Sequence, residues 1–398
     1  MNNFDFCSPT YFAFGKDTEK RVGELTKKFN GSKVLLHYGQ GSVIKSGLLD
    51  IVRESLRQEN IEFVELGGVL PNPRADLVYE GIELCKKEKV DFIIGLGGGS
   101  AIDSAKAISV GSLYDGDFWD FYEMKAIPQK AIPVATILTL AATGSEGSNS
   151  SVISNIKLGK KYGLNSELIR PVFSILNPEY TYSLPAYQTA CGIVDMLSHI
   201  MERYFTNTQD VGLTDRLCEA VMQTLIANGK VAMQDPNNYE ARANLMWSGT
   251  MAHNNILGVG REQDWSSHAM EHELSALYDV AHGAGLAVVF PAFMKFTMPK
   301  HIMRYAQLAN RVFHIEMDFE NPENTARAGI EAFVDFFKSL NMPTTFEELG
   351  AKEEDIPTLA ANARIKGGGD QLGFFEPLNR KDIEAVYQLM LEKNKNNW

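Results

Sequence analysis

Three of the eight histidines in this 398-residue chain fall within fifteen residues, at His268, His272 and His282. Roughly seventy residues earlier, Asp195 and His199 are four positions apart. Together they offer one carboxylate and several imidazoles, the ligand types that a divalent transition metal accepts in proteins. The spacing predicts a metal centre with an Asp/His₃ ligand set.

A purely structural interpretation of each of these residues remains open. Asp195 and His199 share one face of a predicted helix, and such a pair is most often a surface ion pair. His268 and His272 repeat that spacing, and one of them could be a hydrogen-bonded core histidine. His282 precedes a Gly-Ala-Gly run, where the backbone can approach a neighbour or a ligand closely. Three such coincidences in a chain poor in histidine favour the metal.

A second cluster of interest is the Gly-Gly-Gly-Ser run at residues 97–100, which follows an apolar stretch and begins a predicted helix. Free N–H groups and the helix dipole at such a position favour a phosphate. Ser100 and Asp103 also have the spacing of a capping box, so a capped helix after a glycine turn remains the alternative. Residues 139–146 form another hydroxyl-rich turn that is suited to line a cofactor channel.

The elements that must position these residues change character near Pro185. Before it, short apolar runs predict strands, separated by amphipathic helices, at 34–38, 61–66, 92–96 and 132–136. This alternation is typical of a parallel sheet covered on both faces. After it, the pattern predicts helices at 186–206, 211–231, 238–257, 265–278, 300–313, 323–340 and 380–393. We therefore expect an α/β dinucleotide-binding domain over 1–184 and an all-helical metal-binding and substrate domain over 185–398.

Composition excludes several classes of function. The net charge of −12 argues against a basic nucleic-acid-binding surface, and no run approaches the ~20 apolar residues of a membrane span. No signal peptide is visible, and the four cysteines are scattered, as expected for a reducing compartment. No G-x-S-x-G motif supports acyl-enzyme chemistry. A cytoplasmic enzyme is expected, with no nucleic-acid or membrane partner.

Taken together, these motifs resemble the iron-containing alcohol dehydrogenase family, in its butanol dehydrogenase and aldehyde reductase branch. The matching segments are 38–42, 71–73, 97–103, 142–146, 180–185, 241–247 and 376–379, with the Asp-x₃-His and His-x₃-His-x₉-His spacings. The resemblance covers nearly the whole chain. It implies a Rossmann-like N-terminal domain, a helical C-terminal domain as in dehydroquinate synthase, and a homodimer.

For the metal centre, the resemblance implies a divalent ion held by Asp195, His199, His268 and His282. The family suggests Fe²⁺, and Zn²⁺ fits the same ligands. His272 is then expected beside the ion or as the catalytic residue that supplies a proton to the developing alkoxide.

For the nucleotide, the resemblance implies NADPH or NADH as the cofactor. The implied contacts are Gly39, Asn72, Gly98, Gly99, Ser100, Asp103, Thr139, Thr143, Ser145, Lys161 and Tyr182. The family's lysine could equally be Lys160. NAD-selective sites usually place an acid on the adenosine ribose, whereas residues 39–42 carry none and Lys45 is nearby. NADPH is therefore expected to be accepted at least as well as NADH.

The predicted reaction interconverts primary alcohols such as butanol and their aldehydes by hydride transfer. Two alternatives share this architecture: polyol oxidation, as in glycerol dehydrogenase, and a lyase reaction, as in dehydroquinate synthase. A metal-binding protein without redox chemistry would require the glycine turns to be purely structural.

Overall fold

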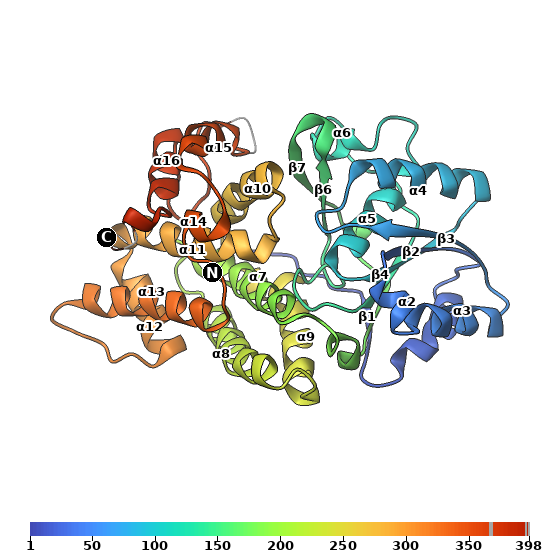
Figure 1. Ribbon diagram of the computed structural model, residues 1–398, viewed down its shortest axis with the longest axis horizontal. Helices are drawn as coiled ribbons and strands as arrows, with labels where there is room; N and C mark the ends of the chain where they lie inside the picture. Colours follow the sequence, from blue (N-terminus) through green and yellow to red (C-terminus); the bar gives the residue numbers. More distant parts are fainter. Residues whose placement is uncertain (366–368, 395, 397–398) are drawn as a thin grey trace. The chain divides into compact units, whose positions relative to one another are not determined.

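The computed structural model describes residues 1–365, 369–394 and 396, and they divide into two compact units (Figure 1). The sheet unit consists of Cys7–Leu184 and Pro236–Asn254. The helical unit consists of Met1–Phe6, Pro185–Asp235 and the chain from Asn255 onward. The main division in the sequence thus falls between Leu184 and Pro185. The exceptions are Pro236–Asn254, which belongs to the sheet unit, and Met1–Phe6, which belongs to the helical unit.

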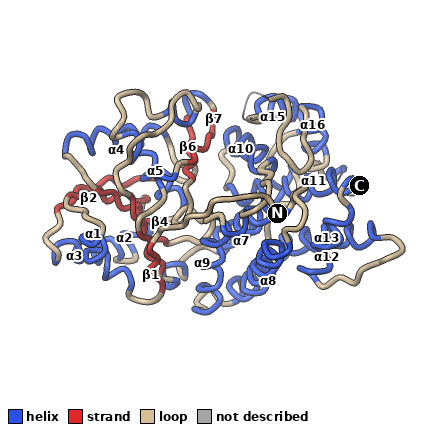
Figure 2. Tube along the Cα trace, turned by 180° about the vertical axis from the view of Figure 1, so that it is seen from behind, coloured by secondary structure: helices blue, strands red, loops and turns tan. Residues whose placement is uncertain are grey.

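The sheet unit is organised around six parallel strands in the order β1-β8-β5-β4-β2-β3. Their bounds are β1 (Tyr11–Phe14), β2 (Lys33–Gly39), β3 (Glu62–Val69), β4 (Phe92–Gly97), β5 (Val134–Leu138) and β8 (Phe173–Leu176). A separate antiparallel hairpin pairs β6 (Ser150–Asn155) with β7 (Lys160–Asn165). Among the described residues, the strands lie only in this unit, as Figure 2 shows in red.

Helices cover both faces of this sheet. They are α1 (Val22–Lys28), α2 (Ser42–Lys45), α3 (Leu48–Gln58), α4 (Ala75–Glu88), α5 (Gly99–Gly111), α6 (Trp119–Tyr122) and α9 (Tyr239–His253). Successive strand residues point to opposite faces of the sheet. Ile93 of β4 packs in the core with α4 and α5, and Ile94 packs in the core with α1 and α3. Strands buried on both faces explain the continuous apolar runs of the sequence.

Helix α9 belongs to the sheet unit because of its packing. Met246 is buried in a small core with Ile102, Leu138 and Leu176, which are contributed by α5, β5 and β8. The helix itself was expected from the sequence pattern. Its packing against the sheet could not be predicted from that pattern.

The order of the strands creates a switch point between β2 and β4. From β2 the chain adds β3 on one side, and then returns to add β4, β5 and β8 on the other. Tyr38 pairs with Leu96, so Gly39 and Gly97 end neighbouring strands at one edge. In open parallel sheets, ligands bind outside the carboxyl ends of the strands at such a point.

The helical unit contains the remaining helices: α7 (Ala186–Tyr204), α8 (Gly212–Gln234), α10 (Ser266–Tyr278), α11 (His282–Thr297), α12 (Ile302–Phe313), α13 (Pro322–Ser339), α14 (Phe346–Leu349), α15 (Ile356–Asn362) and α16 (Arg380–Gln388). Within the described ranges, no helix has the combined length and apolar character that a bilayer crossing requires.

Several elements differ from the sequence-based expectation. The strands β1 and β8 are four residues each, and the β6–β7 hairpin is largely polar, so none produced a recognisable apolar run. Helix α11 was missed for another reason: it is buried almost throughout and carries Pro291. A helix that is apolar all round shows no amphipathic period.

Candidate functional site

One face of α7 carries three acidic or imidazole side chains in succession. Asp195, His199 and Glu202 are spaced so that all three lie along the same side of the helix, and all are buried. The His199 Nε2 atom lies 3.4 Å from Asp195 Oδ1. The pair is 2–3% exposed, so it is not the surface ion pair that its spacing alone would suggest.

Helix α10 brings His268 to the same place. Its Nε2 atom is 3.9 Å from Asp195 Oδ1, and its ring stacks on that of His199 with centroids 4.8 Å apart. Its position is fixed by Glu202, whose Oε1 atom accepts hydrogen bonds from both the Nδ1 and the backbone N–H of His268, each 2.9 Å long. Glu202 also accepts from the N–H of Trp265 at 3.0 Å, which satisfies the start of α10.

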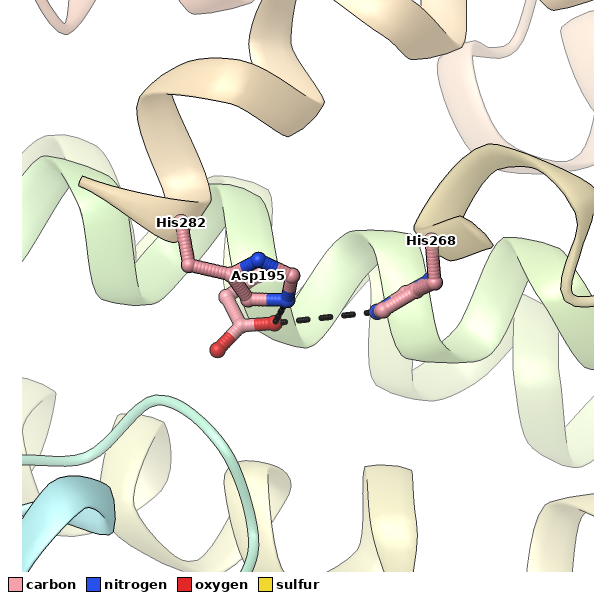
Figure 3. Close-up of side chains that lie close together, drawn as sticks. All are labelled: Asp195, His268 and His282. Carbon is pink, nitrogen blue, oxygen red and sulfur yellow. Dashed lines mark ion pairs between the residues drawn. The ribbon is translucent and has the colours of Figure 1, made fainter. Parts of the chain in front are cut away.

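His282 is the first residue of α11 and completes the group shown in Figure 3. Its Nε2 atom is 3.7 Å from the same Asp195 oxygen, and its Nδ1 is hydrogen-bonded to Glu271. The start of α11 packs directly on α7, because a Cβ on Gly283 would lie 2.1 Å from the carbonyl oxygen of Cys191. Glycine at this position is therefore what lets His282 approach Asp195.

The donor atoms suit a single small cation. Ligand atoms about 2.1 Å from one ion at tetrahedral angles lie ~3.4 Å apart. The three imidazole nitrogens are 3.4, 3.9 and 3.7 Å from Asp195 Oδ1. In two of the imidazoles, Nδ1 faces a carboxylate, which turns Nε2 toward the centre, as is usual for metal-bound histidine. The residues thus fit the metal that their types predicted.

The histidines differ in how closely their ligand atoms approach the other ligand atoms of the site. Asp195, His268 and His282 have ligand atoms all within 4.8 Å of one another, and His199 joins them through its contact with Asp195. A second grouping of the same tightness consists of Glu271, His272 and His282. The His272 ring lies 5.6 Å from that of His282 and is partly exposed, so it is adjacent to the cluster and accessible.

Buried carboxylates dominate the electrostatics of this centre. Asp195, Glu202 and Glu271 are each at most 2% exposed. Burial raises the pKa of Glu202 to about 8. A dication among these groups would oppose that effect, because a nearby positive charge favours the ionised carboxylate. The glutamates were missed at the sequence level, where an acid on a helix looks like a solvated surface charge.

The nucleotide residues expected from the sequence gather mainly at the carboxyl edge of the sheet. Gly39 ends β2, Gly98 follows β4 and Thr139 follows β5. Asn72 follows β3, and Tyr182 comes shortly after β8. Because parallel strands end at the same edge, these five positions share the edge that contains the switch point.

The turn after β4 is shaped by its glycines. Gly97 has a φ of 147°, and a Cβ on Gly99 would lie 2.4 Å from the hydroxyl of Thr143. The first N–H groups of α5 have no acceptor within the helix, so this turn offers donors to a phosphate. Ser100 lies in the first turn and is partly exposed. The backbone cradle fits an anionic group such as a dinucleotide phosphate.

The structure rules out the alternative interpretation of Ser100 and Asp103 as a capping box. Gly98 is the N-cap of α5, and no side chain caps the helix. Asp103 instead accepts a hydrogen bond from the Ser145 hydroxyl at 2.6 Å and another from the Val152 N–H at 2.9 Å. One carboxylate oxygen is thereby bonded to the loop after β5 and the other to strand β6. Ser145 is itself buried.

The two candidate lysines of the hairpin lie in different surroundings. Lys160 forms an ion pair with Glu123 at 2.9 Å and is partly exposed. Lys161 is 7% exposed. Burial raises the pKa of Asp103, and Lys161 is one of the groups whose charge opposes this rise. Of the two, Lys161 faces the interior of the sheet unit. Lys106 was not singled out from the sequence, although it is completely buried in α5.

Comparison with known proteins agrees with this combination of a parallel nucleotide-type sheet and a buried carboxylate–imidazole centre. Residues 9–178 match the family described as iron-containing alcohol dehydrogenase, and residues 189–391 match the C-terminal part of the Fe-containing alcohol dehydrogenase family. The chain belongs to the iron-containing alcohol dehydrogenase family. The expected family and fold class are confirmed.

Among its relatives, the chain is 40% identical to the NADH-dependent butanol dehydrogenase A of Clostridium acetobutylicum, over 98% of this chain and 99% of that one. It is 36% identical to the NADPH-dependent aldehyde reductase YqhD of Escherichia coli, with the same coverage. The crystal structure of NADH-dependent butanol dehydrogenase A from Thermotoga maritima superposes with a TM-score of 0.95 at 40% identity, covering 98% of this chain and 99% of that one.

Proposed function

We propose that the protein is a metal-dependent, NAD(P)H-linked alcohol dehydrogenase and aldehyde reductase acting on primary alcohols such as butanol and the corresponding aldehydes. The observation that carries the proposal is the convergence of three imidazole nitrogens on one oxygen of Asp195. Relatives named for butanol and aldehyde chemistry support the substrate class.

Asp195, His199, His268 and His282 would hold the metal, with Fe²⁺ favoured by the family name and Zn²⁺ as the alternative. When bound, such a dication supplies Lewis-acid polarisation of a carbonyl oxygen. Glu202 and Glu271 keep the rings of His268 and His282 in the orientation that binding requires. Because His282 is the fourth proposed ligand, His272 is not assigned to the metal.

His272 would serve as the proton donor in aldehyde reduction and the acceptor in alcohol oxidation. It is partly exposed, and its ring is 5.6 Å from that of His282. An imidazole suits this role, because its ordinary pKa of ~6.5 lets it exchange a proton near neutrality.

In the sheet unit, the backbone at Gly98, Gly99 and Ser100 would bind the nucleotide phosphates. Gly39, Asn72, Thr139, Thr143 and Tyr182 would contact the rest of the cofactor, since most of them follow strand ends at the switch-point edge. We retain Lys161 as a further contact. When bound, the reduced nicotinamide would supply the hydride for aldehyde reduction, and the oxidised form would accept it in alcohol oxidation.

Two further expectations belong to this proposal. All four cysteines are free thiols, which supports a reducing, cytoplasmic compartment. A homodimer is proposed on the family resemblance alone. Size-exclusion chromatography with light scattering tests it, and a monomer of 44.2 kDa would refute it.

The test of the activity uses purified protein reconstituted with Fe²⁺ or Zn²⁺, NADPH or NADH, and butanal. Loss of reduced-nucleotide absorbance that depends on both metal and aldehyde is the expected result. Glycerol with the oxidised nucleotide tests the polyol alternative. Metal binding without nucleotide binding would refute the redox function, and turnover of glycerol but not of butanal would replace the proposed substrate class.

A further inference from the structure

Helix α5 contains a lysine with no exposed surface. The Nζ atom of Lys106 is 2.6 Å from the carbonyl oxygen of Ser145, 2.9 Å from that of Ser148 and 2.9 Å from that of Ser150. An ammonium has three hydrogens to donate, and these carbonyls, together with the Ser145 hydroxyl oxygen at 2.9 Å, provide acceptors for all of them. Burying such a group is costly unless it is fully hydrogen-bonded, which makes the contact with this loop specific.

The same helix holds both ends of that loop through Asp103. The Ser145 hydroxyl and the Val152 N–H donate to the Asp103 carboxylate, and the Ser151 hydroxyl donates to its backbone carbonyl at 2.8 Å. Asp103 and Lys106 lie on α5 one turn apart, so together they fasten residues 145–152 along the helix. Burial lowers the pKa of Lys106 to about 8, and the charge of Asp103 opposes this change.

The fastened loop continues directly from the cradle at the start of α5. Thr143 lies against Gly99, and its hydroxyl accepts a hydrogen bond from the Ser145 N–H at 3.2 Å. The position of Thr143 over the first turn of α5 therefore depends on where residue 145 is held. Its carbonyl is also 2.6 Å from His253 Nδ1 on α9.

We propose that Lys106 is a positioning residue for the nucleotide, fixing the loop that places Thr143 over the phosphate cradle without itself touching the cofactor. This inference rests on the proposed function of the sheet unit. It predicts that replacing Lys106 lowers the affinity for the nucleotide and changes neither the affinity for the metal nor the rate of the chemical step.

The test is Lys106→Met in the metal-loaded full chain, with direct titration of NADPH and NADH followed by fluorescence. A loosened loop should raise the nucleotide Kd and KM by about tenfold, which corresponds to a loss of ~1.4 kcal/mol of binding free energy. Turnover at saturating nucleotide and metal content should stay near wild type. Hydrogen exchange at residues 139–152 should become faster.

Lys33→Met is the matched control. Lys33 begins β2 at the amino edge of the same sheet, is partly buried and pairs with Glu88 at 3.2 Å. This change removes a lysine from the same unit and should leave the nucleotide Kd unchanged. If Lys106→Met does not fold, Lys106→Gln keeps an N–H donor, and a smaller rise in Kd is then expected.

The outcomes separate the two proposals. If wild-type protein binds neither nucleotide, the proposed function fails, and the role of Lys106 fails with it. If wild-type protein binds nucleotide and a folded Lys106 variant binds it equally well, only the positioning role is overturned. A loss confined to turnover, with unchanged nucleotide Kd, would also overturn it.

Discussion

The two candidate sites of this chain are built by opposite means. The proposed metal centre consists of side chains, with Asp195, His268 and His282 brought together from α7, α10 and α11. The nucleotide edge consists largely of backbone, where strands end at Gly39 and Gly97 and α5 begins. In the sequence, metal ligands are thus recognised by residue type. A phosphate-binding turn is recognised mainly by glycines, which leave the backbone N–H groups accessible.

Both sites also contain buried charged side chains that contact the groups proposed to bind the ligand. Glu202 and Glu271 hold imidazole rings of the metal centre. Asp103 and Lys106 hold the loop beside the phosphate cradle. The comparison therefore predicts that supporting residues tune affinity at each site, while the ligands themselves decide whether binding occurs at all.

The largest effect is expected at a metal ligand. His199→Ala removes an imidazole 3.4 Å from Asp195 and should abolish both bound metal and reductase activity. Helix α7 should remain folded, because alanine is a good helix former. Metal content by mass spectrometry and circular dichroism measure the two parts of this prediction.

The control is His314→Asn. His314 is exposed and has a φ of 58°, which asparagine tolerates better than alanine. This variant should keep its metal. Stoichiometric metal together with full turnover in His199→Ala would remove His199 from the ligand set.

A smaller but still large effect is expected at His272. His272→Phe should lower turnover by about 10²-fold or more while retaining the metal, because it removes a proton donor and not a ligand. The pH–rate profile should lose the limb that an imidazole produces. His282→Phe provides the comparison and should lose the metal. The opposite pattern would show that the roles of these two histidines are exchanged.

The sequence singled out the candidate metal ligands of this molecule but not the residues that support them. An Asp-x₃-His pair and clustered histidines stand out in a chain with eight histidines, and the structure does bring these side chains together. Their service as ligands stays a prediction. Glu202 and Lys106 were not recognised, because a single charged residue on a helix is ordinarily a surface residue. Only the fold reveals that both are buried.

The same limit applies to the fold. The central strands β2, β4 and β5 were predicted within about two residues of their observed starts, because burial on both faces produces apolar runs. The edge strand β1 is too short to show such a run, and α11 is apolar on every side. Periodicity reports the contrast between two faces of an element, so elements without that contrast are missed.

A supporting residue of the metal centre should have an intermediate effect. In Glu202→Gln, an NH₂ group takes the place of one carboxylate oxygen. Because the two oxygens accept from the Trp265 N–H and from His268 Nδ1, one of these donors would then face the NH₂ group and lose its acceptor. Metal affinity should fall by about 10- to 100-fold, as found for other residues that orient metal-bound histidines. Competition with a chelator measures this affinity.

Glu219→Gln is the matched control for that variant. Glu219 is also a buried glutamate of the helical unit, but it accepts from the Tyr204 hydroxyl at 2.9 Å and pairs with Arg311 at 3.1 Å. It should lose stability without losing metal affinity. Equal metal affinities in the two variants would mean that Glu202 has no particular role in holding His268.

The smallest expected effect concerns the choice of nucleotide at Gly39. A Cβ on this residue would have Val69 O as its nearest neighbour, at 3.8 Å, so a side chain fits without displacing the backbone. In Gly39→Asp, a carboxylate would face the adenosine ribose and repel a 2′-phosphate. The ratio of kcat/KM for NADPH to that for NADH should fall about tenfold, as a charge repulsion of ~1.4 kcal/mol produces. Gly39→Asn has the same shape without the charge and should change the ratio little.

Wild-type protein should accept NADPH at least as well as NADH. A strong wild-type preference for NADH would show that the missing acid at residues 39–42 does not set selectivity, and equal ratios in the Asp and Asn variants would show that the ribose does not lie beside Gly39.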